Sequence, residues 1–173
     1  MPATRDQLLE RLGALEIDTK TVEHPPLFTV EESRALRGKI PGAHTKNLFL
    51  KCKKGTIWLI VALENADINL KTAHKVIGSG RLSFGRAELL EETLGVLPGS
   101  VTPFSLINDT ENRVSVVLDA AMMEHDVLNF HPLENTATTT ISRDGLLKFV
   151  RDCGHDPRIL NVSAAADEGD VTL

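Results

Sequence analysis

The spacing of apolar residues predicts a helix at the start of the chain and a strand after it. Leucines recur at helical spacing through residues 4–15, and Thr4 with Gln7 forms a capping-box pattern at the start of that helix. Residues 19–24 then alternate between polar and apolar side chains, which is typical of a half-buried strand. Two prolines follow directly, so we expect the strand to end before them.

A β-hairpin is the clearest pattern in the middle of the chain. Residues 47–52 and 56–62 flank the turn sequence Lys53-Lys54-Gly55. The second of these segments is apolar almost throughout, so we expect it to be a central strand of a sheet. The other predicted helices span residues 29–36, 70–77, 86–94, about 120–123 and 142–150, and the other predicted strands span residues 81–84, 113–118, 127–130 and 136–141.

The order of these elements predicts the fold class. Helices and strands intermingle without a regular βαβ rhythm, which favours an α+β fold with a mixed central sheet and surrounding helices. The 173 residues amount to one domain, and no linker or repeat divides them. We expect a single domain over residues 1–173 that ends in a loose tail at residues 160–173.

Composition and charge exclude several functions. The net charge of −5 argues against a general DNA-binding protein, and 4% aromatic residues argue against a multi-ring platform for single-stranded nucleic acid. The charge is uneven, however, because residues 34–54 hold seven Lys and Arg and no acid. Such a face can meet a phosphate backbone while the bulk of the protein is acidic, although charge runs in general are more often solvated surfaces.

Neither a metal site nor a membrane segment is predicted. Cys52 and Cys153 lie far from any Cys/His cluster, so we expect two inert reduced thiols and no zinc. The first residues contain no apolar signal region, and no apolar run approaches the ~20 residues that span a bilayer. These features predict a soluble, cytoplasmic protein without a membrane partner.

Common catalytic motifs are missing, but several short blocks resemble a known family. GxSxG, HExxH, GxGxxG and the P-loop are absent. The blocks are His24-Pro25 followed by Phe28–Glu32, Lys46–Leu50, Pro98–Phe104, His131–Asn135 with Thr138-Thr139, and Gly154–Pro157. Their order over about residues 20–157 resembles the YbaK/ProX aminoacyl-tRNA editing domains. They are most similar to the freestanding ProXp-ala (PrdX) type and to the insertion domain of bacterial prolyl-tRNA synthetase.

The resemblance implies an enzyme that proofreads aminoacyl-tRNA. The expected reaction is hydrolysis of Ala-tRNA(Pro) to alanine and tRNA(Pro), without a metal or other cofactor. A synthetase pocket shaped for proline excludes smaller alanine by only ~1–3 kcal/mol, so a second, smaller pocket is needed for fidelity. Hydrolysis of an activated ester needs orientation and charge stabilisation more than a strong nucleophile, so the missing triad is compatible with catalysis.

The family's motifs also imply roles for individual residues. Lys46 is expected to bind the phosphate or ribose of the 3′-terminal adenosine. Gly99 and Ser100 are expected to offer main-chain N–H groups to a developing oxyanion, and His131 to position a water or the ester. Asn47 completes the predicted catalytic set, either through a hydrogen bond to substrate or as a cap of its strand.

A small pocket and a tRNA-binding face are further expectations. The predicted pocket residues are Val30, Phe49, Ile60, Phe104 and Thr138, for which ordinary core packing is the alternative. The predicted tRNA-binding residues are Lys51, Lys53, Lys54 and Arg81, for which the alternative is a solvating role. Lys51 would lie about 15 Å from Lys46 along a strand, which suits the acceptor stem of tRNA(Pro).

Two other functions fit the same residues. The domain can be a non-catalytic module that binds tRNA or a synthetase, or a deacylase of another mischarged tRNA, such as Cys-tRNA(Pro), Ser-tRNA or Thr-tRNA. Prolyl-tRNA synthetase or an elongation factor is expected only as a transient partner, and DNA is not expected as a partner at all.

Overall fold

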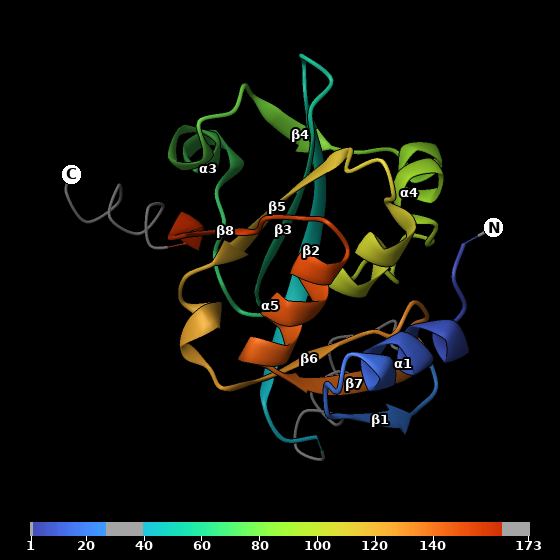
Figure 1. Cartoon of the computed structure of the whole chain (residues 1–173). Coiled ribbons are helices and arrows are strands. Elements are labelled where there is room, and N and C mark those ends of the chain that lie inside the picture. The colour runs from blue at the N-terminus through green and yellow to red at the C-terminus, as the bar shows by residue number, and fades with distance from the viewer. Residues whose placement is uncertain (1, 27–39, 164–173) are drawn as a thin grey trace.

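The computed structural model describes residues 2–26 and 40–163 (Figure 1). The helices are α1 (Arg5–Ala14), α3 (Leu70–Ile77), α4 (Ala87–Leu94) and α5 (Arg143–Asp152), with 3-10 helices η1 (Pro103–Asn108) and η2 (Met122–Glu124). The strands are β1 (Thr19–Glu23), β2 (Ala43–Cys52), β3 (Ile57–Leu63), β4 (Leu82–Phe84), β5 (Val114–Asp119), β6 (Val127–Phe130), β7 (Ala137–Ser142) and β8 (Arg158–Leu160). The predicted helix at residues 29–36 lies outside the described residues.

Short polar caps and glycines set the ends of the helices. The Thr4 hydroxyl accepts from Gln7 N–H while the Gln7 side chain accepts from Thr4 N–H, so the predicted capping box is confirmed. Asn69 caps α3, and Gly78 ends that helix with φ +81°, a conformation that glycine adopts without strain. These local signals explain why the helix boundaries could be read from the sequence.

All eight strands form one mixed sheet in the order β1-β7-β6-β2-β3-β5-β8, with β4 pairing β2 outside this path. β3 runs antiparallel to β2 and parallel to β5, so it is the central strand that its apolar sequence predicted. The fold is therefore the predicted α+β domain with a mixed sheet.

β2 is longer than the sequence pattern predicted and links the two halves of the sheet. Its first residues, Ala43 and His44, pair in parallel with β6, and its last residues, Leu50–Cys52, pair with β4. β6 and β4 lie on the same edge of β2, because β3 occupies the other edge. Between them, around Lys46 and Asn47, this edge of β2 meets no strand of the described chain.

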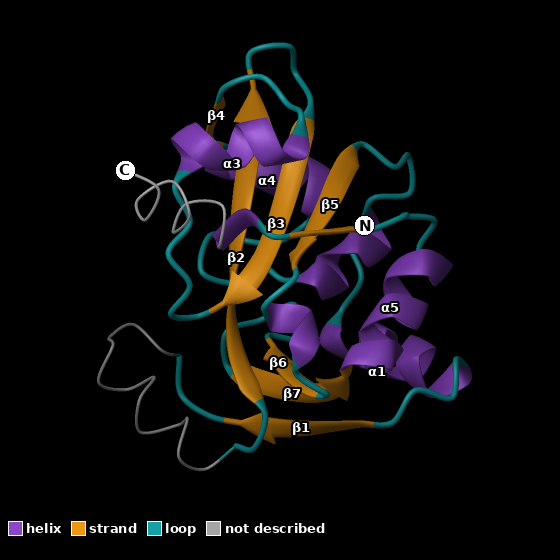
Figure 2. Ribbon diagram, turned by 90° about the vertical axis from the view of Figure 1, so that its left-hand side faces the viewer, coloured by secondary structure: helices purple, strands orange, loops and turns teal. Residues whose placement is uncertain are grey.

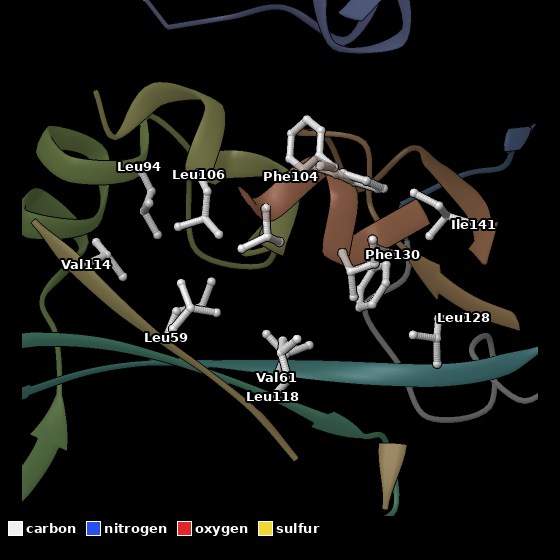
Figure 3. Packing of buried hydrophobic residues seen from close by; sticks show 14 of the residues in the cluster. Leu59, Val61, Leu94, Phe104, Leu106, Val114, Leu118, Leu128, Phe130 and Ile141 are labelled. Atoms are coloured by element: carbon white, nitrogen blue, oxygen red, sulfur yellow. The ribbon is translucent and has the colours of Figure 1, made fainter. Parts of the chain in front are cut away.

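The two faces of the sheet are packed differently. One face carries the main apolar cluster, in which α1, α4, η1 and α5 cover side chains of the strands (Figure 3). Phe104 lies at its centre, with ring centroids 5.8 Å from Phe130 and 5.5 Å from Phe149. Figure 2 shows α1 and α5 lying together on one side of β6 and β7. The opposite face carries a smaller cluster in which α3 covers Leu50, Trp58 and Ile60.

The structure corrects two details near the end of the sequence. The predicted helix at about residues 120–123 is the 3-10 turn η2. The predicted loose tail begins too early, because Leu160 ends strand β8 and Val162 is fully buried. The buried Asp119 carboxylate accepts hydrogen bonds from Val162 N–H, Ser163 N–H and the Ser163 hydroxyl, which anchors the chain as far as residue 163.

Candidate active site

Lys46 lies in the middle of β2, on the face that also carries Leu48 and Leu50. Its Nζ donates a hydrogen bond to the main-chain oxygen of Ala66, in the turn that follows β3. An ammonium group has three N–H donors, so this bond orients the Lys46 side chain and leaves two donors for a ligand.

Asn47 presents unpaired polar groups at the open edge of β2. Cys52 N–H donates to Thr56 O and Glu64 N–H donates to His44 O, so the even-numbered residues of β2 hydrogen-bond to β3. The odd-numbered residues therefore direct their N–H and C=O groups to the opposite edge, where Gly85 N–H donates to Phe49 O. The main-chain groups of Asn47 point into the gap between β6 and β4, and no described residue pairs with them.

The Asn47 side chain adds a second unsatisfied group. Its Oδ1 atom is buried and has no hydrogen-bond partner among the described residues. A buried acceptor without a partner costs about 1–3 kcal/mol, which a donor on a bound ligand would recover. The alternative prediction is that the Asn47 side chain caps its strand. Its Oδ1 atom makes no such capping hydrogen bond among the described residues.

The loop before η1 contains a tight turn at Gly99. Ser100 N–H donates to Leu97 O over 3.0 Å, and Gly99 has φ +92°. Proline at the second position and a left-handed glycine at the third are typical of a type II turn. Because Ser100 N–H is used inside the turn, it does not offer the predicted oxyanion donor, whereas Gly99 N–H has no partner in the described chain.

His131 directly follows β6 and begins the turn to β7, next to the Gly99 turn. A methyl group added to Gly99 would lie 3.9 Å from Nδ2 of Asn135, so the two turns are neighbours. His131 Nδ1 lies 3.0 Å from the main-chain oxygen of Ala137. A carbonyl only accepts, so Nδ1 carries the proton in this bond and Nε2 of the neutral ring is an acceptor. Leu133 takes φ +73°, a strained value for a non-glycine residue, within this turn.

Burial keeps the His131 ring neutral. Removal from water is the main cause that lowers its pKa below the ordinary 6.5, and the nearby His24 lowers the pKa further, against the opposing effect of the Ala137 hydrogen bond. The ring centroids of His24 and His131 are 6.3 Å apart. At neutral pH His131 therefore acts as a hydrogen-bond acceptor through Nε2 and not as a cation.

His24 and Thr138 frame His131. His24 Nδ1 lies 2.8 Å from Pro25 O and its Nε2 lies 2.8 Å from the Thr138 hydroxyl. The carbonyl fixes the proton on Nδ1, so in the neutral ring Nε2 accepts from Thr138. The sequence indicated His24 only as a structural residue, and its contact with Thr138 depends on the pairing of β1 with β7, which no short motif reveals.

One face of the sheet holds the polar residues of the predicted site. His44 pairs with Asn129 across β2 and β6, and alternation puts Lys46, two residues further along β2, on that same face. Thr138 shares it, because Asn129 accepts from Thr140, two residues further along β7. His131 follows β6, and its ring lies 6.3 Å from that of His24, which hydrogen-bonds Thr138. The fold thus gathers Lys46, His131 and Thr138 on one side of the sheet.

The predicted pocket residues are not brought together. Phe49 and Phe104 belong to the main apolar cluster, whereas Ile60 lies in the cluster on the opposite face under α3. Phe104 is fully buried between two other rings, so its position is that of a core residue. These three side chains cannot line one pocket, and Val30 lies outside the described residues.

Comparison with known proteins gives the family. The model of the aminoacyl-tRNA editing domain matches residues 24–149. The chain belongs to the aminoacyl-tRNA editing domain family. This result confirms the resemblance that the ordered sequence blocks indicated.

Relatives support this assignment over nearly the whole editing domain. A prolyl-tRNA synthetase associated domain-containing protein 1 from Mus musculus is 45% identical over 162 residues, which cover 91% of this chain and 95% of that protein. The prolyl-tRNA editing protein ProX from Acetoanaerobium sticklandii is 34% identical over 152 residues, 87% of this chain and 93% of that protein. A crystal structure of a candidate trans-editing enzyme for prolyl tRNA synthetase has the same fold, with a TM-score of 0.68, 23% identity and coverage of 90% and 94%.

The predicted tRNA-binding cations of the editing domain lie at the far end of β2 from His44. Lys51 is on β2, Lys53 and Lys54 form the turn to β3, and Arg81 precedes β4. Lys53, Lys54 and Arg81 are exposed. β2 and β4 pair through Lys51 and Ser83, so all four cations gather around one end of the sheet.

The remaining chemistry of the editing domain is sparse. Within residues 2–26 and 40–163, no group of three or more His, Cys, Asp or Glu side chains is arranged to hold a metal ion. Cys52 is buried, and burial raises the pKa of the half-buried Cys153 to about 11. No helix among the described residues has the length and apolar character needed to cross a membrane.

Proposed function

We propose that this editing domain hydrolyses the ester bond of mischarged tRNA without a metal, and that Ala-tRNA(Pro) is its substrate. The observation that carries the proposal is the open edge of β2. There the unpaired main chain of Asn47 adjoins an ammonium group on Lys46 that has donors to spare. Membership in the editing family and the likeness to a prolyl-tRNA editing protein support the choice of reaction and tRNA.

The reaction needs donors where negative charge develops. When water attacks the ester carbonyl, its oxygen becomes an oxyanion, and fixed N–H groups stabilise that charge. Asn47 N–H and Gly99 N–H have no partner among the described residues, and the proposal assigns both to this role. Both are held in place, Asn47 by the β2–β3 pairing and Gly99 by its turn.

Lys46 and His131 orient the two ends of the reacting group. The spare donors of Lys46 bind the phosphate or ribose of the terminal adenosine. The neutral His131 accepts a hydrogen bond at Nε2 from the attacking water or from a ribose hydroxyl, and the Ala137 carbonyl holds its ring in that orientation. Positioning of water by an acceptor with a lowered pKa remains effective at neutral pH.

The open main-chain edge of Asn47 offers a place for the amino acid, whereas its side chain lies on the opposite face from Lys46, with Phe49. The main-chain oxygen of Asn47 accepts from a donor, and the α-ammonium of an aminoacyl ester is such a donor. The proposal requires that the space at this edge admits alanine and excludes proline, which is the second sieve that a proline-shaped synthetase pocket requires.

The cations at the end of β2 bind the acceptor stem. Lys51, Lys53, Lys54 and Arg81 contact phosphates, which gives affinity with little base reading. This local charge solves the problem of an acidic protein that binds a polyanion.

The decisive experiment is a deacylation panel in excess EDTA. Purified protein is mixed with Ala-, Cys-, Ser-, Thr- and Pro-charged tRNA, with Ala-tRNA(Pro) as the reference, and release of the amino acid is measured. We expect rapid release of alanine and none of proline. Release of another amino acid in preference to alanine would overturn the substrate, and loss of activity that zinc restores would overturn the metal-independent mechanism.

A matched lysine pair separates catalysis from simple binding. Lys148 Nζ also donates to a main-chain oxygen, that of Leu15, but on the helix α5. Lys46→Ala is expected to lose deacylation, while Lys148→Ala retains it. Tight tRNA binding by the wild-type protein without any hydrolysis would instead favour the non-catalytic module.

A further inference from the structure

The structure brings two acid-free parts of the sequence together. Residues 43–63 and 68–87 hold eight of the 19 Lys and Arg residues and none of the 24 Asp and Glu residues. They form β2, β3, α3 and β4, which pack against one another, and α3, β4 and the turn between β2 and β3 lie at one end of the molecule (Figure 1). We call this part the acid-free unit. Besides the four cations already described, it contributes Lys71 and Lys75, both exposed on α3, and the exposed Arg86.

One large apolar side chain stands exposed in this unit. Phe84, the last residue of β4, is 64% exposed, whereas Leu82 two residues earlier packs under α3. Arg81 and Arg86 flank it in the sequence, and the neighbouring Ser83 pairs with Lys51. An aromatic ring held among cations is the arrangement that stacks on a nucleobase while the cations meet phosphates.

The backbone beneath Phe84 is firmly held. Gly85 N–H donates to Phe49 O over 3.0 Å, and a methyl group added at Gly85 would lie 2.4 Å from the Phe49 ring. The close packing of Gly85 on Phe49 fixes the end of β4 against β2. A ring presented from such a rigid strand loses little conformational freedom on binding.

The distance between Phe84 and Lys46 indicates which nucleotide of the RNA lies at Phe84. Phe84 pairs with Leu50, so it lies on the same face of the sheet as Lys46, four residues along β2. At ~3.3 Å per residue this separation is about 13 Å. Stacked nucleotides rise about 3.4 Å each, so the distance corresponds to about four nucleotides.

We propose that Phe84 stacks on a base of the unpaired 3′ segment of tRNA, close to its junction with the acceptor stem, while the terminal adenosine occupies Lys46. This contact rests on the proposed function, because it assumes that Lys46 receives the esterified end. Low aromatic content excludes a platform of several rings, as the composition predicted, but one ring suffices for a single base.

The test uses the full chain and an uncharged acceptor-stem minihelix. Phe84→Ala is expected to weaken minihelix binding about 5- to 100-fold, the range for loss of one base–aromatic contact. Phe84→Trp is expected to bind as the wild type does. The control is Ile159→Ala, which removes a side chain 47% exposed on β8, outside the acid-free unit, and should leave binding unchanged.

Two measurements distinguish stacking of Phe84 on a base from an effect on the charged contacts with phosphates. Stacking releases no counterions, so Phe84→Ala should leave the salt dependence of binding unchanged. A 2-aminopurine placed in turn at each unpaired position should be quenched by wild-type protein at one position, and that quenching should disappear in Phe84→Ala. Equal binding by wild type and Phe84→Ala, or an altered salt slope, would overturn the proposal.

Failure of the proposed function gives a different pattern. Hydrolysis of aminoacyl-adenosine, which lacks the rest of the 3′ segment, should be the same in wild type and Phe84→Ala. A wild-type protein that cleaves no aminoacyl ester would overturn the deacylase, yet the minihelix measurements would still decide whether Phe84 stacks on RNA.

Discussion

The two faces of the central sheet differ in what covers them and in what they can do. The face under α1, α4, η1 and α5 is mainly apolar and includes most of the fully buried side chains. The opposite face is apolar beneath α3, around Trp58 and Ile60. It is polar around Thr138 on β7, where His24 follows β1 and His131 follows β6.

The difference separates stability from chemistry. A packed apolar face leaves no room for a charged substrate, because burial of an unpaired charge is costly. The polar part of the other face keeps the Lys46 ammonium, the neutral His131 imidazole and the Thr138 hydroxyl on one side of the sheet, so a charged ester can be bound there. Substitutions on the two faces should therefore fail in different ways, and the following expectations run from the largest effect to the smallest.

Phe104→Ala should lower the stability of the fold, because the face under α1, α4, η1 and α5 is its core. Removal of a fully buried phenylalanine costs about 3–5 kcal/mol of the free energy of unfolding. Urea or thermal unfolding measures the loss. Phe84→Ala is the matched control, and as an exposed site it should change stability by no more than about 0.5 kcal/mol. Equal losses in the two variants would contradict the division between the faces.

Lys46→Ala should reduce deacylation roughly 100-fold or more while the fold is retained, because loss of a group that positions the substrate costs about that much in rate. Single-turnover hydrolysis of Ala-tRNA(Pro) measures the rate, and circular dichroism checks the fold. Turnover close to that of Lys148→Ala would remove Lys46 from the site.

We expect weaker tRNA binding when four cations are changed to Gln, namely Lys51, Lys53, Lys54 and Arg81. The slope of log affinity against log salt concentration should fall in magnitude by about 3, since each phosphate contact contributes ~0.7–0.9 to that slope. A variant with Lys20, Arg113, Lys148 and Arg151 changed to Gln has the same net charge and serves as the control. Hydrolysis of aminoacyl-adenosine should survive in both. The same slope in the two variants would show that tRNA is bound elsewhere.

His131 should make a small, pH-dependent contribution to stability. Its pKa is lowered in the folded state, chiefly by burial, so the unfolded chain binds more protons between that pKa and 6.5. The free energy of unfolding should therefore fall as the pH drops below 6.5, and less so in His131→Asn. Chemical denaturation at pH 7 and pH 5 compares the free energies of unfolding of the wild type and His131→Asn. Deacylation by the wild type should likewise persist somewhat below pH 6.5, because the neutral ring persists there.

Local patterns predicted the secondary structure because its causes are local. The capping box at Thr4, the apolar run of β3 and the Ser142 cap of α5 each act within a few residues, and each is found where the pattern indicated. The boundaries of β2 were predicted too short, since Ala43 and His44 become a strand only by pairing with the distant β6.

Part of the site could also be predicted from the sequence, because the causes of that part are local. The ordered motifs indicated Lys46, Gly99 and His131, whose positions depend on short turns and on one strand. They could not indicate that Ile60 and Phe49 lie on opposite faces, although strand alternation within the hairpin contains that information once the register is known. They also could not reveal His24 as the partner of Thr138.

By itself the sequence determined the elements, the mixed α+β class and the editing family, because propensity, caps and ordered motifs are properties of neighbouring residues. Only the tertiary structure decided which polar groups remain unpaired. Asn47 is left at an open edge because β6 and β4 pair with opposite ends of β2. His131 is kept neutral because the strands around it exclude water. Phe84 stands among cations because α3 and β4 fold against one hairpin. Each of these features arises from contacts between distant segments, whose free energy no single segment contains.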